Sequence, residues 1–469
     1  MNTHSHTSQP SPMPTSQHVR ALMRLGVPLI GGHVAQFAIG LTDTIMLGWY
    51  SVQSLAAVVL GSTFFFVIFI LGSGFAIAVM PLVAEAEAED DQQGLRRITR
   101  MGLWLSLIFG IVVQPLFLLS GTLLLGLQQA PDVAELSQAY LRIAGLGLVP
   151  ALLVMVLKSY LAALEHTRVV FWVTMAAVPI NALVNYWLIF GNAGLPELGV
   201  RGAAIASIIV QFVSLIGVIL YALRALPEHA LFARIWRPDW EVFASVFRLG
   251  LPIGLTNLAE VGLFSASSIM MGWLGTIALA AHGVALQLAS LAFMVHLGLS
   301  NAATVRVGNA MGRKDADHMA RGAQVAIVMS LLIAFVAVAV FLLVPEQLLG
   351  LFIKPDEPQR DVIIATGVGL LYVAALFQVV DGAQIMALGL LRGVQDTRGP
   401  MVIAAVSYWI IGVPSAYFLG FVWQWGGEGV WFGLVLGLTA AAILLMLRFW
   451  VTDLARLRKR FGREPKEAI

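Results

Sequence analysis

Long apolar segments, separated by short polar connections, follow one another along most of this chain. The hydrocarbon core of a bilayer is about 30 Å thick and needs about 20 apolar residues for each helical crossing. By this measure the pattern predicts twelve membrane-spanning helices and therefore an all-α membrane protein. The predicted spans cover residues 25–48, 55–80, 101–125, 138–160, 169–191, 200–223, 247–271, 278–303, 322–344, 362–388, 400–420 and 429–450.

An internal repeat divides the chain into two halves. The stretch Arg24 to Trp49 matches the stretch Arg248 to Trp273 without gaps, so that the first residues and the last residues of the two stretches correspond. Six spans in each half give both halves the same orientation in the membrane, which is the pattern of a parallel repeat in secondary transporters. We therefore expect two pseudo-symmetric six-helix lobes, at residues 20–224 and 246–452.

Three segments flank these lobes. Residues 1–19 are polar and are predicted to form a disordered cytoplasmic tail. Residues 225–245 contain Trp236 and Trp240 and are predicted to form an amphipathic cytoplasmic linker, as a helix lying at the lipid headgroups. Residues 453–469 are predicted to form a basic cytoplasmic tail.

Composition and charge agree with a membrane location. Of the 469 residues 59% are hydrophobic and only 12% are charged, whereas about a quarter are charged in soluble proteins. The formal net charge of +2 gives no indication of nucleic-acid binding, and the absence of cysteine excludes disulfides and thiol chemistry. Lysine and arginine concentrate in alternate loops, so the positive-inside rule predicts that both termini are cytoplasmic.

Three carboxylates lie inside the apolar spans: Asp43, Glu260 and Asp381. Each costs about 2.5–3.5 kcal/mol near a helix centre on translocon scales, so we expect all three to face a cavity or a partner. A helix rise of about 1.5 Å per residue places Glu260 about 18 Å from Arg248, and Asp381 about 16 Å from Arg392. These two acids therefore belong near the membrane midplane in the second lobe, whereas Asp43 lies nearer the outer leaflet. Either they form a proton or sodium site, or they are permanent polar contacts between helices.

Other polar residues within the spans support a transport site less directly. Asn181 and Asn185 share one helix face and could join Asp43 in a polar network, or could simply hold helices together. Pro28 and Pro252 are either hinges or fixed kinks. Three histidines are expected mainly to make helix contacts; they are His33, His282 and His296.

Taken together, four motifs make the chain similar to the multidrug and toxic compound extrusion (MATE) family, and to its NorM-type branch, from about residue 20 to 455. The motifs are Gly40-Leu-Thr-Asp43-Thr-Ile-Met-Leu-Gly48, Pro179-Ile-Asn181 with Asn185, Leu251-Pro252 with Glu260, and Phe377-Gln-Val-Val-Asp381 running to Leu391-Arg392-Gly393. A seventh-span Glu combined with a tenth-span Asp resembles the NorM-type branch rather than the DinF branch.

The resemblance implies two lobes in a V shape around a central cavity, in a bacterial inner membrane. It implies export of small cationic drugs in exchange for Na⁺ or H⁺, with cation coupling at Glu260, Asp381 and Asp43. If Na⁺ is the coupling ion, Glu260 and Asp381 are its ligands. Some sodium-coupled members carry a Tyr four residues before the tenth-span Asp, where this chain has Phe377, so the coupling ion stays open.

The sequence further leads us to expect no enzymatic activity, no cofactor, no nucleic-acid partner, and a monomer whose partners are drugs and membrane lipids. The alternative within the superfamily is a lipid-linked oligosaccharide flippase. Flippases of this kind usually carry more cationic residues within their spans to hold pyrophosphate. The membrane interior of this chain is expected to be acidic, which favours the antiporter.

Overall fold

The computed structural model describes residues 13–353, 355 and 357–462 and is almost entirely helical. The α-helices are α1 (Thr15–Tyr50), α2 (Val52–Ala88), α3 (Gln92–Val112), α4 (Gln114–Leu118), α5 (Ser120–Gly126), α6 (Pro131–Ala144), α7 (Leu148–Ala163), α8 (Thr167–Phe190), α9 (Val200–Ala225), α10 (Trp240–Leu274), α11 (Thr276–Gly312), α12 (Ala316–Leu343), α13 (Pro345–Gly350), α14 (Arg360–Gly393), α15 (Arg398–Ala405), α16 (Val413–Tyr417), α17 (Gly426–Leu447) and α18 (Leu454–Phe461). Within the described part of the chain, twelve helical stretches are long and apolar enough to cross a membrane. The predicted fold class and number of spans are therefore confirmed.

The helix bounds repeat between the two halves. The sequence offset that aligns Arg24 with Arg248 also aligns both ends of α2 with the two ends of α11. The same offset aligns the first residue of α3 with the first residue of α12. The fourth span differs from its counterpart α14, because a 3₁₀ turn at Gly145–Gly147 separates α6 from α7. Two glycines followed by Pro150 weaken the α-helix there, since glycine has low helix propensity and proline has no N–H to donate.

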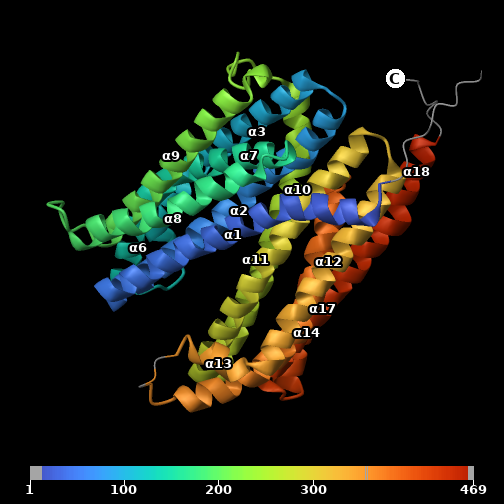
Figure 1. The fold of residues 1–469 in the computed structure, drawn as a ribbon. Coiled ribbons are helices and arrows are strands. Elements are labelled where there is room, and N and C mark those ends of the chain that lie inside the picture. The colour runs from blue at the N-terminus through green and yellow to red at the C-terminus, as the bar shows by residue number, and fades with distance from the viewer. Residues whose placement is uncertain (1–12, 354, 356, 463–469) are drawn as a thin grey trace, which may run out of the picture.

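The two halves form the two arms of a V (Figure 1). Helices α1 to α9 make one lobe and helices α10 to α18 make the other. The arms are apart at the end that carries α6 and α13, and they meet toward the end that carries α18 and the C-terminus (Figure 1). Where they meet, α1 packs against α11 and α2 packs against both α10 and α11.

Glycines allow the lobes to approach closely at this junction. A methyl group added at Gly254 of α10 would lie 2.3 Å from the carbonyl oxygen of Leu71 in α2, and one added at Gly74 would lie 2.3 Å from the carbonyl oxygen of Gly250. Small residues at such a crossing let two backbones touch, which is how helices associate inside a membrane. Gly298 of α11 makes the pseudo-symmetric contact with Ile30 of α1.

The flanking segments differ from their predicted form. Helix α1 begins at Thr15, so residues 15–19 of the predicted disordered tail are helical, and residues 1–12 lie outside the described residues. The linker 225–245 is not one amphipathic helix: it contains a 3₁₀ turn at Pro227–His229 and further turns, and α10 already starts at Trp240. Asp239 caps this helix by accepting a hydrogen bond from the N–H of Val242, which fixes its first residue.

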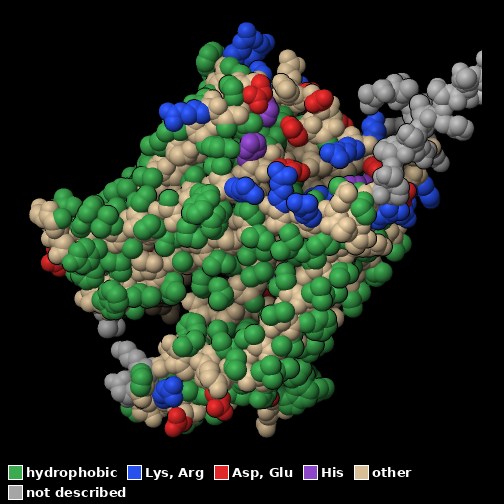
Figure 2. Space-filling view, in the orientation of Figure 1, with side chains coloured by type: hydrophobic (Ala, Val, Ile, Leu, Met, Phe, Trp, Pro, Cys, Tyr) green, Lys and Arg blue, Asp and Glu red, His purple; other side chains and the backbone are tan. Residues whose placement is uncertain are grey.

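The surface has the charge distribution of a membrane protein. In the face shown in Figure 2, hydrophobic side chains cover a broad band across both lobes, and most Lys and Arg side chains gather at the end near α18. Membrane lipid solvates such an apolar band, so the many exposed Leu, Val, Ile and Phe side chains need no protein partner.

Candidate functional site

A cavity of about 500 Å³ lies between the two lobes. Its wall is mostly apolar, and the side chains come from α1, α2, α7 and α8 of the first lobe and from α10, α11 and α14 of the second. The residues that line it are Leu29, His33, Phe66, Ile70, Ser73, Ile77, Met80, Met155, Lys158, Ser159, Val170, Asn257, Glu260, Val261, Phe264, Ser265, Ser268, Leu286, Ala289, Ser290, Phe293, Met294, Leu297, Asn301, Phe377, Asp381, Ile385 and Arg392. Aromatic and Met side chains can adapt to molecules of several shapes.

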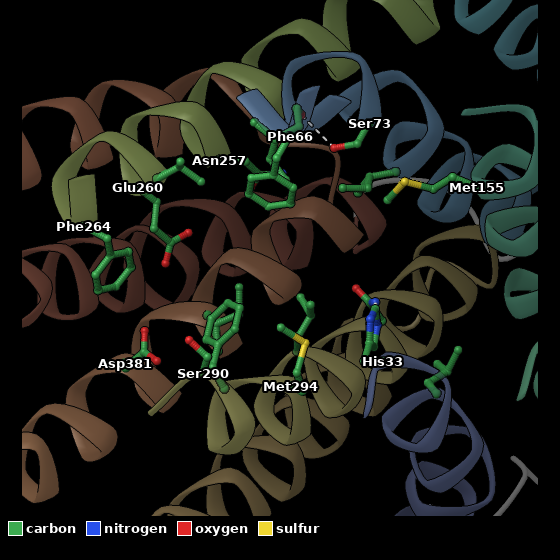
Figure 3. A pocket seen from close by; sticks show the side chains of 18 of the residues that line it. His33, Phe66, Ser73, Met155, Asn257, Glu260, Phe264, Ser290, Met294 and Asp381 are labelled. Carbon is green, nitrogen blue, oxygen red and sulfur yellow. Dashed lines mark hydrogen bonds between the residues drawn. The ribbon is translucent and has the colours of Figure 1, made fainter. Parts of the chain in front are cut away.

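The structure brings Glu260 and Asp381 to the same cavity, although two complete membrane-spanning helices, α11 and α12, lie between them in the sequence. In Figure 3 both carboxylates point into this space, Glu260 from α10 and Asp381 from α14. Their exposed fractions are only 8% and 1%. Within the described residues, one oxygen of each carboxylate is buried without a hydrogen-bond partner. Such oxygens are available for a proton, a metal ion or a cationic ligand.

Two basic side chains also line this cavity, so the expectation of an acidic membrane interior is wrong for the cavity wall. Arg392 is buried and donates a hydrogen bond from Nη2 to Oδ1 of Asn257 at 2.8 Å. Lys158, on α7, donates from Nζ to Oγ1 of Thr174 at 2.8 Å. With Glu260 and Asp381, the cavity wall thus contains two acidic and two strongly basic side chains.

Helix periodicity in the sequence indicates that some of these polar cavity residues share a helix face with Glu260 or Asp381. Arg392 follows Asp381 by eleven residues, which is about three turns of helix, so both side chains share one face of α14. Asn257 precedes Glu260 by three residues and shares its face of α10. Lys158 was detectable as the single Lys within the predicted span 138–160.

Of two further polar side chains behind the acids, Gln384 follows Asp381 by three residues on one face of α14, whereas Tyr408 had no such signal. Tyr408, from the π-helical segment Val406–Gly412, is fully buried, and its hydroxyl accepts a hydrogen bond from Nε2 of Gln384 at 2.5 Å. Only the packing of this segment against α10 and α17 places the tyrosine in the second-lobe polar cluster.

Asp43 belongs to a separate polar cluster in the first lobe. Its Oδ1 accepts hydrogen bonds from Nδ2 of Asn181 at 2.9 Å and from Nδ2 of Asn185 at 2.5 Å. Nδ2 of Asn185 also lies 3.3 Å from Oδ1 of Asn181. Asp43 and the two asparagines are not part of the wall of the central cavity. The three residues therefore form the network that their spacing suggested, but apart from Glu260 and Asp381.

The structure also shows where the two prolines, His33 and Phe377 lie. Pro28 and Pro252 lie inside the continuous helices α1 and α10. His33 lines the cavity, and its Nε2 lies 3.0 Å from Nδ2 of Asn301, which links α1 to α11 across the two lobes. Phe377 is buried against Phe264 and Trp431, so this position supplies no hydroxyl next to Asp381.

The buried histidines make contacts between helices. The Nε2 of His282 lies 3.0 Å from the hydroxyl of Ser268, and its Nδ1 accepts a hydrogen bond from Trp431. His296 contacts the hydroxyl of Ser330 through Nδ1 at 3.0 Å. These contacts agree with the interpretation of both residues as helix-contact histidines.

Known proteins resemble this chain over almost its whole length. The family model MatE matches residues 28–187 and 252–418. Two relatives, each named probable multidrug resistance protein NorM, are 44% identical to it: one from Agrobacterium fabrum, over 92% of this chain and 93% of the relative, and one from Rhizobium meliloti, over 96% and 95%.

Solved structures share the fold. The eukaryotic MATE transporter AtDTX14 superposes with a TM-score of 0.85 at 19% identity, covering 95% of this chain and 99% of the other. A multidrug resistance MATE family transporter of the MOP superfamily in an outward-facing conformation superposes with a TM-score of 0.83 at 21% identity, covering 97% and 100%.

Proposed function

Because this chain belongs to the MATE family and to its NorM-type branch, we propose that it is a multidrug efflux transporter that exports small cationic, amphipathic drugs in exchange for Na⁺ or H⁺. The observation that carries the exchange mechanism is the shared position of Glu260 and Asp381 on the wall of one cavity between the lobes. Two carboxylates with unpartnered oxygens in apolar surroundings favour binding of positive charge.

The mechanism that we propose is competition for these two carboxylates. A cationic drug binds in the cavity with its charge near Glu260 and Asp381 and its apolar part against the Phe and Met side chains. Na⁺ or H⁺ entering from outside then neutralises the acids and removes the attraction that holds the drug. Arg392 and Lys158 line the same cavity and offset part of the negative charge of the two carboxylates.

Alternating access fits the arrangement of the lobes. The V is open at the end opposite the C-terminus and closed by the contacts of α1 and α2 with α10 and α11. The concentration of Lys and Arg near α18 supports a cytoplasmic position for both termini, in a bacterial inner membrane, by the positive-inside rule. In that orientation the cavity faces outward. Asp43 with Asn181 and Asn185 is a second candidate site for the coupling cation, in the first lobe.

The test is uptake of a fluorescent cationic drug into inside-out vesicles, with a proton gradient or a sodium gradient imposed separately. We expect Glu260→Gln to abolish gradient-driven uptake. Glu241→Gln is the matched control, since Glu241 lies on the same helix but is exposed in its first turn. Uptake by Glu260→Gln at the wild-type rate would exclude the proposed role of this carboxylate.

A second candidate function is favoured by the two basic residues of the cavity. Lys158 and Arg392 could hold the pyrophosphate of a lipid-linked oligosaccharide, so the flippase alternative gains support that the sequence did not give it. The same assay separates the two functions. An antiporter responds to one of the two gradients, whereas drug uptake that responds to neither gradient would favour the flippase.

A further inference from the structure

A second hollow, of about 850 Å³, is formed by the start of α3, the turns of the linker and the start of α10, and we call it the linker groove. It lies at the end of the first lobe on the side of the chain termini and shares no lining residue with the central cavity. Its lining residues are Gln93, Arg96, Arg97, Arg100, Met101, Ala233, Arg234, Arg237, Pro238, Asp239 and Trp240.

Side chains of α3 fix the backbone of the linker that forms this groove. Arg96 donates a hydrogen bond from Nε to the carbonyl of His229 at 2.7 Å, and Arg100 donates from Nε to the carbonyl of Leu231 at 2.9 Å. Trp104 donates from Nε1 to the carbonyl of Ile235 at 2.8 Å. The groove is therefore a defined feature of the fold, held by donors spaced along α3 at positions 96, 100 and 104.

The groove carries a large excess of positive charge. Its wall contains five arginines and one carboxylate, which gives a formal charge of 5 − 1 = +4. The carboxylate, Asp239, is paired with Arg97. Arg234 and Arg237 are exposed, and no side chain in the described part of the chain pairs with their guanidinium groups, so these groups can bind an anion. The nearest further acid in the sequence is Glu241, exposed in the first turn of α10.

The groove also has the position of a lipid-headgroup site. Trp240, which lines the groove, is 65% exposed, and Trp236, next to the lining residue Arg237 in the sequence, is 72% exposed. Trp side chains concentrate where a membrane meets water. Helices α3 and α10 enter the predicted membrane spans from this point. An anion held by these arginines would thus lie at headgroup depth.

We propose that the linker groove binds the phosphate group of an anionic phospholipid from the leaflet on the side of the chain termini. Arginine guanidinium groups match phosphate oxygens with paired hydrogen bonds, and basic pockets at helix ends on this side of a membrane bind anionic lipid headgroups. Because the linker connects the two lobes, the bound lipid would stabilise the contact between them. This inference does not depend on the central cavity or on the coupling ion.

The experiment measures lipid binding to the full-length protein by native mass spectrometry. The probes are a phosphatidylglycerol and a phosphatidylcholine with the same acyl chains. The test variant is Arg234→Gln with Arg237→Gln, chosen because neither side chain holds the linker in place. The matched control is Arg313→Gln with Arg321→Gln, which removes two exposed arginines at the same end of the second lobe, outside the linker groove.

We expect wild-type protein to prefer phosphatidylglycerol, and the test variant to bind it roughly 25-fold more weakly, about fivefold for each arginine near an anionic surface. Binding of phosphatidylcholine should stay unchanged in both variants, which also reports that they are folded. The proposal fails if the test variant keeps the wild-type preference, or if the control loses it equally. Displacement of phosphatidylglycerol by inorganic phosphate would assign the groove to a soluble anion and would also overturn the lipid proposal.

Discussion

The contact between α2 and α10 offers the sharpest test of how the lobes are held together. A Cβ atom at Gly254 would lie 2.3 Å from the carbonyl oxygen of Leu71, whereas ordinary van der Waals contact lies at 3.4–4 Å. The obstructing atom belongs to the backbone of a long helix and cannot rotate away. The substitution Gly254→Ala therefore requires the two helices to separate, and this helix pair belongs to the closed end of the V.

The size of the effect follows from the packing. Inserting a methyl group into a well-packed contact costs about 1–3 kcal/mol when backbones must move. If the closed contact exists in one conformation of the transport cycle and not in the other, this cost changes the ratio of the two by about 5- to 150-fold. The control is Gly283→Ala on α11, because a methyl group there meets nothing within 4 Å. Both substitutions raise helix propensity equally, so only the steric contact differs.

The assay measures distances between two spin labels across the open end of the V. The chain contains no cysteine, so Cys residues introduced at Gln129, before α6, and Leu351, after α13, can be labelled without background. We expect Gly254→Ala to increase the population with shorter distances, and Gly283→Ala to match the unsubstituted protein. If Gly254→Ala left the distance distribution unchanged, the contact would not hold the lobes in this conformation and the reasoning would be refuted.

Three further predictions concern charged groups. Asp43→Asn should reduce gradient-driven export at least about tenfold, measured in the vesicle assay, because it removes the charge that two asparagine amides surround. Lys158→Gln should strengthen binding of a monovalent cationic drug about tenfold, because it removes a like charge from the wall of the same cavity, and calorimetric titration would measure it; unchanged affinity would argue that Lys158 does not act on the substrate. Hydrogen bonding to Arg97 lowers the pKa of Asp239 below its ordinary value of 3.8. The pair therefore stabilises the folded protein fully above pH 3.8, and this contribution is lost as the pH falls through the lowered pKa. Asp239→Asn should therefore lower the free energy of unfolding at pH 7 by less than about 1 kcal/mol, with the difference from wild type fading below pH 3.8 in a thermal-melt series; a difference that persists at lower pH would contradict this origin.

The sequence by itself determined the number of spans, the duplication and the identity of the acidic residues. The thickness of the bilayer sets the length of each apolar segment, so twelve segments can be counted without a structure. An ionisable group inside such a segment is costly, which made Asp43, Glu260 and Asp381 stand out. Helix periodicity also placed Asn181 and Asn185 on one face, and the structure joins them to Asp43.

Only the tertiary structure decided which charges share a cavity. Periodicity assigns a side chain to a face of its own helix, but the contact of that face with another helix depends on packing between segments far apart in the sequence. Glu260 and Asp381 meet because α10 and α14 both line the space between the lobes, and Lys158 joins them from α7. Packing also fixes the linker: arginines and a tryptophan of α3 donate hydrogen bonds to backbone carbonyls that lie 131 to 133 residues further along the chain.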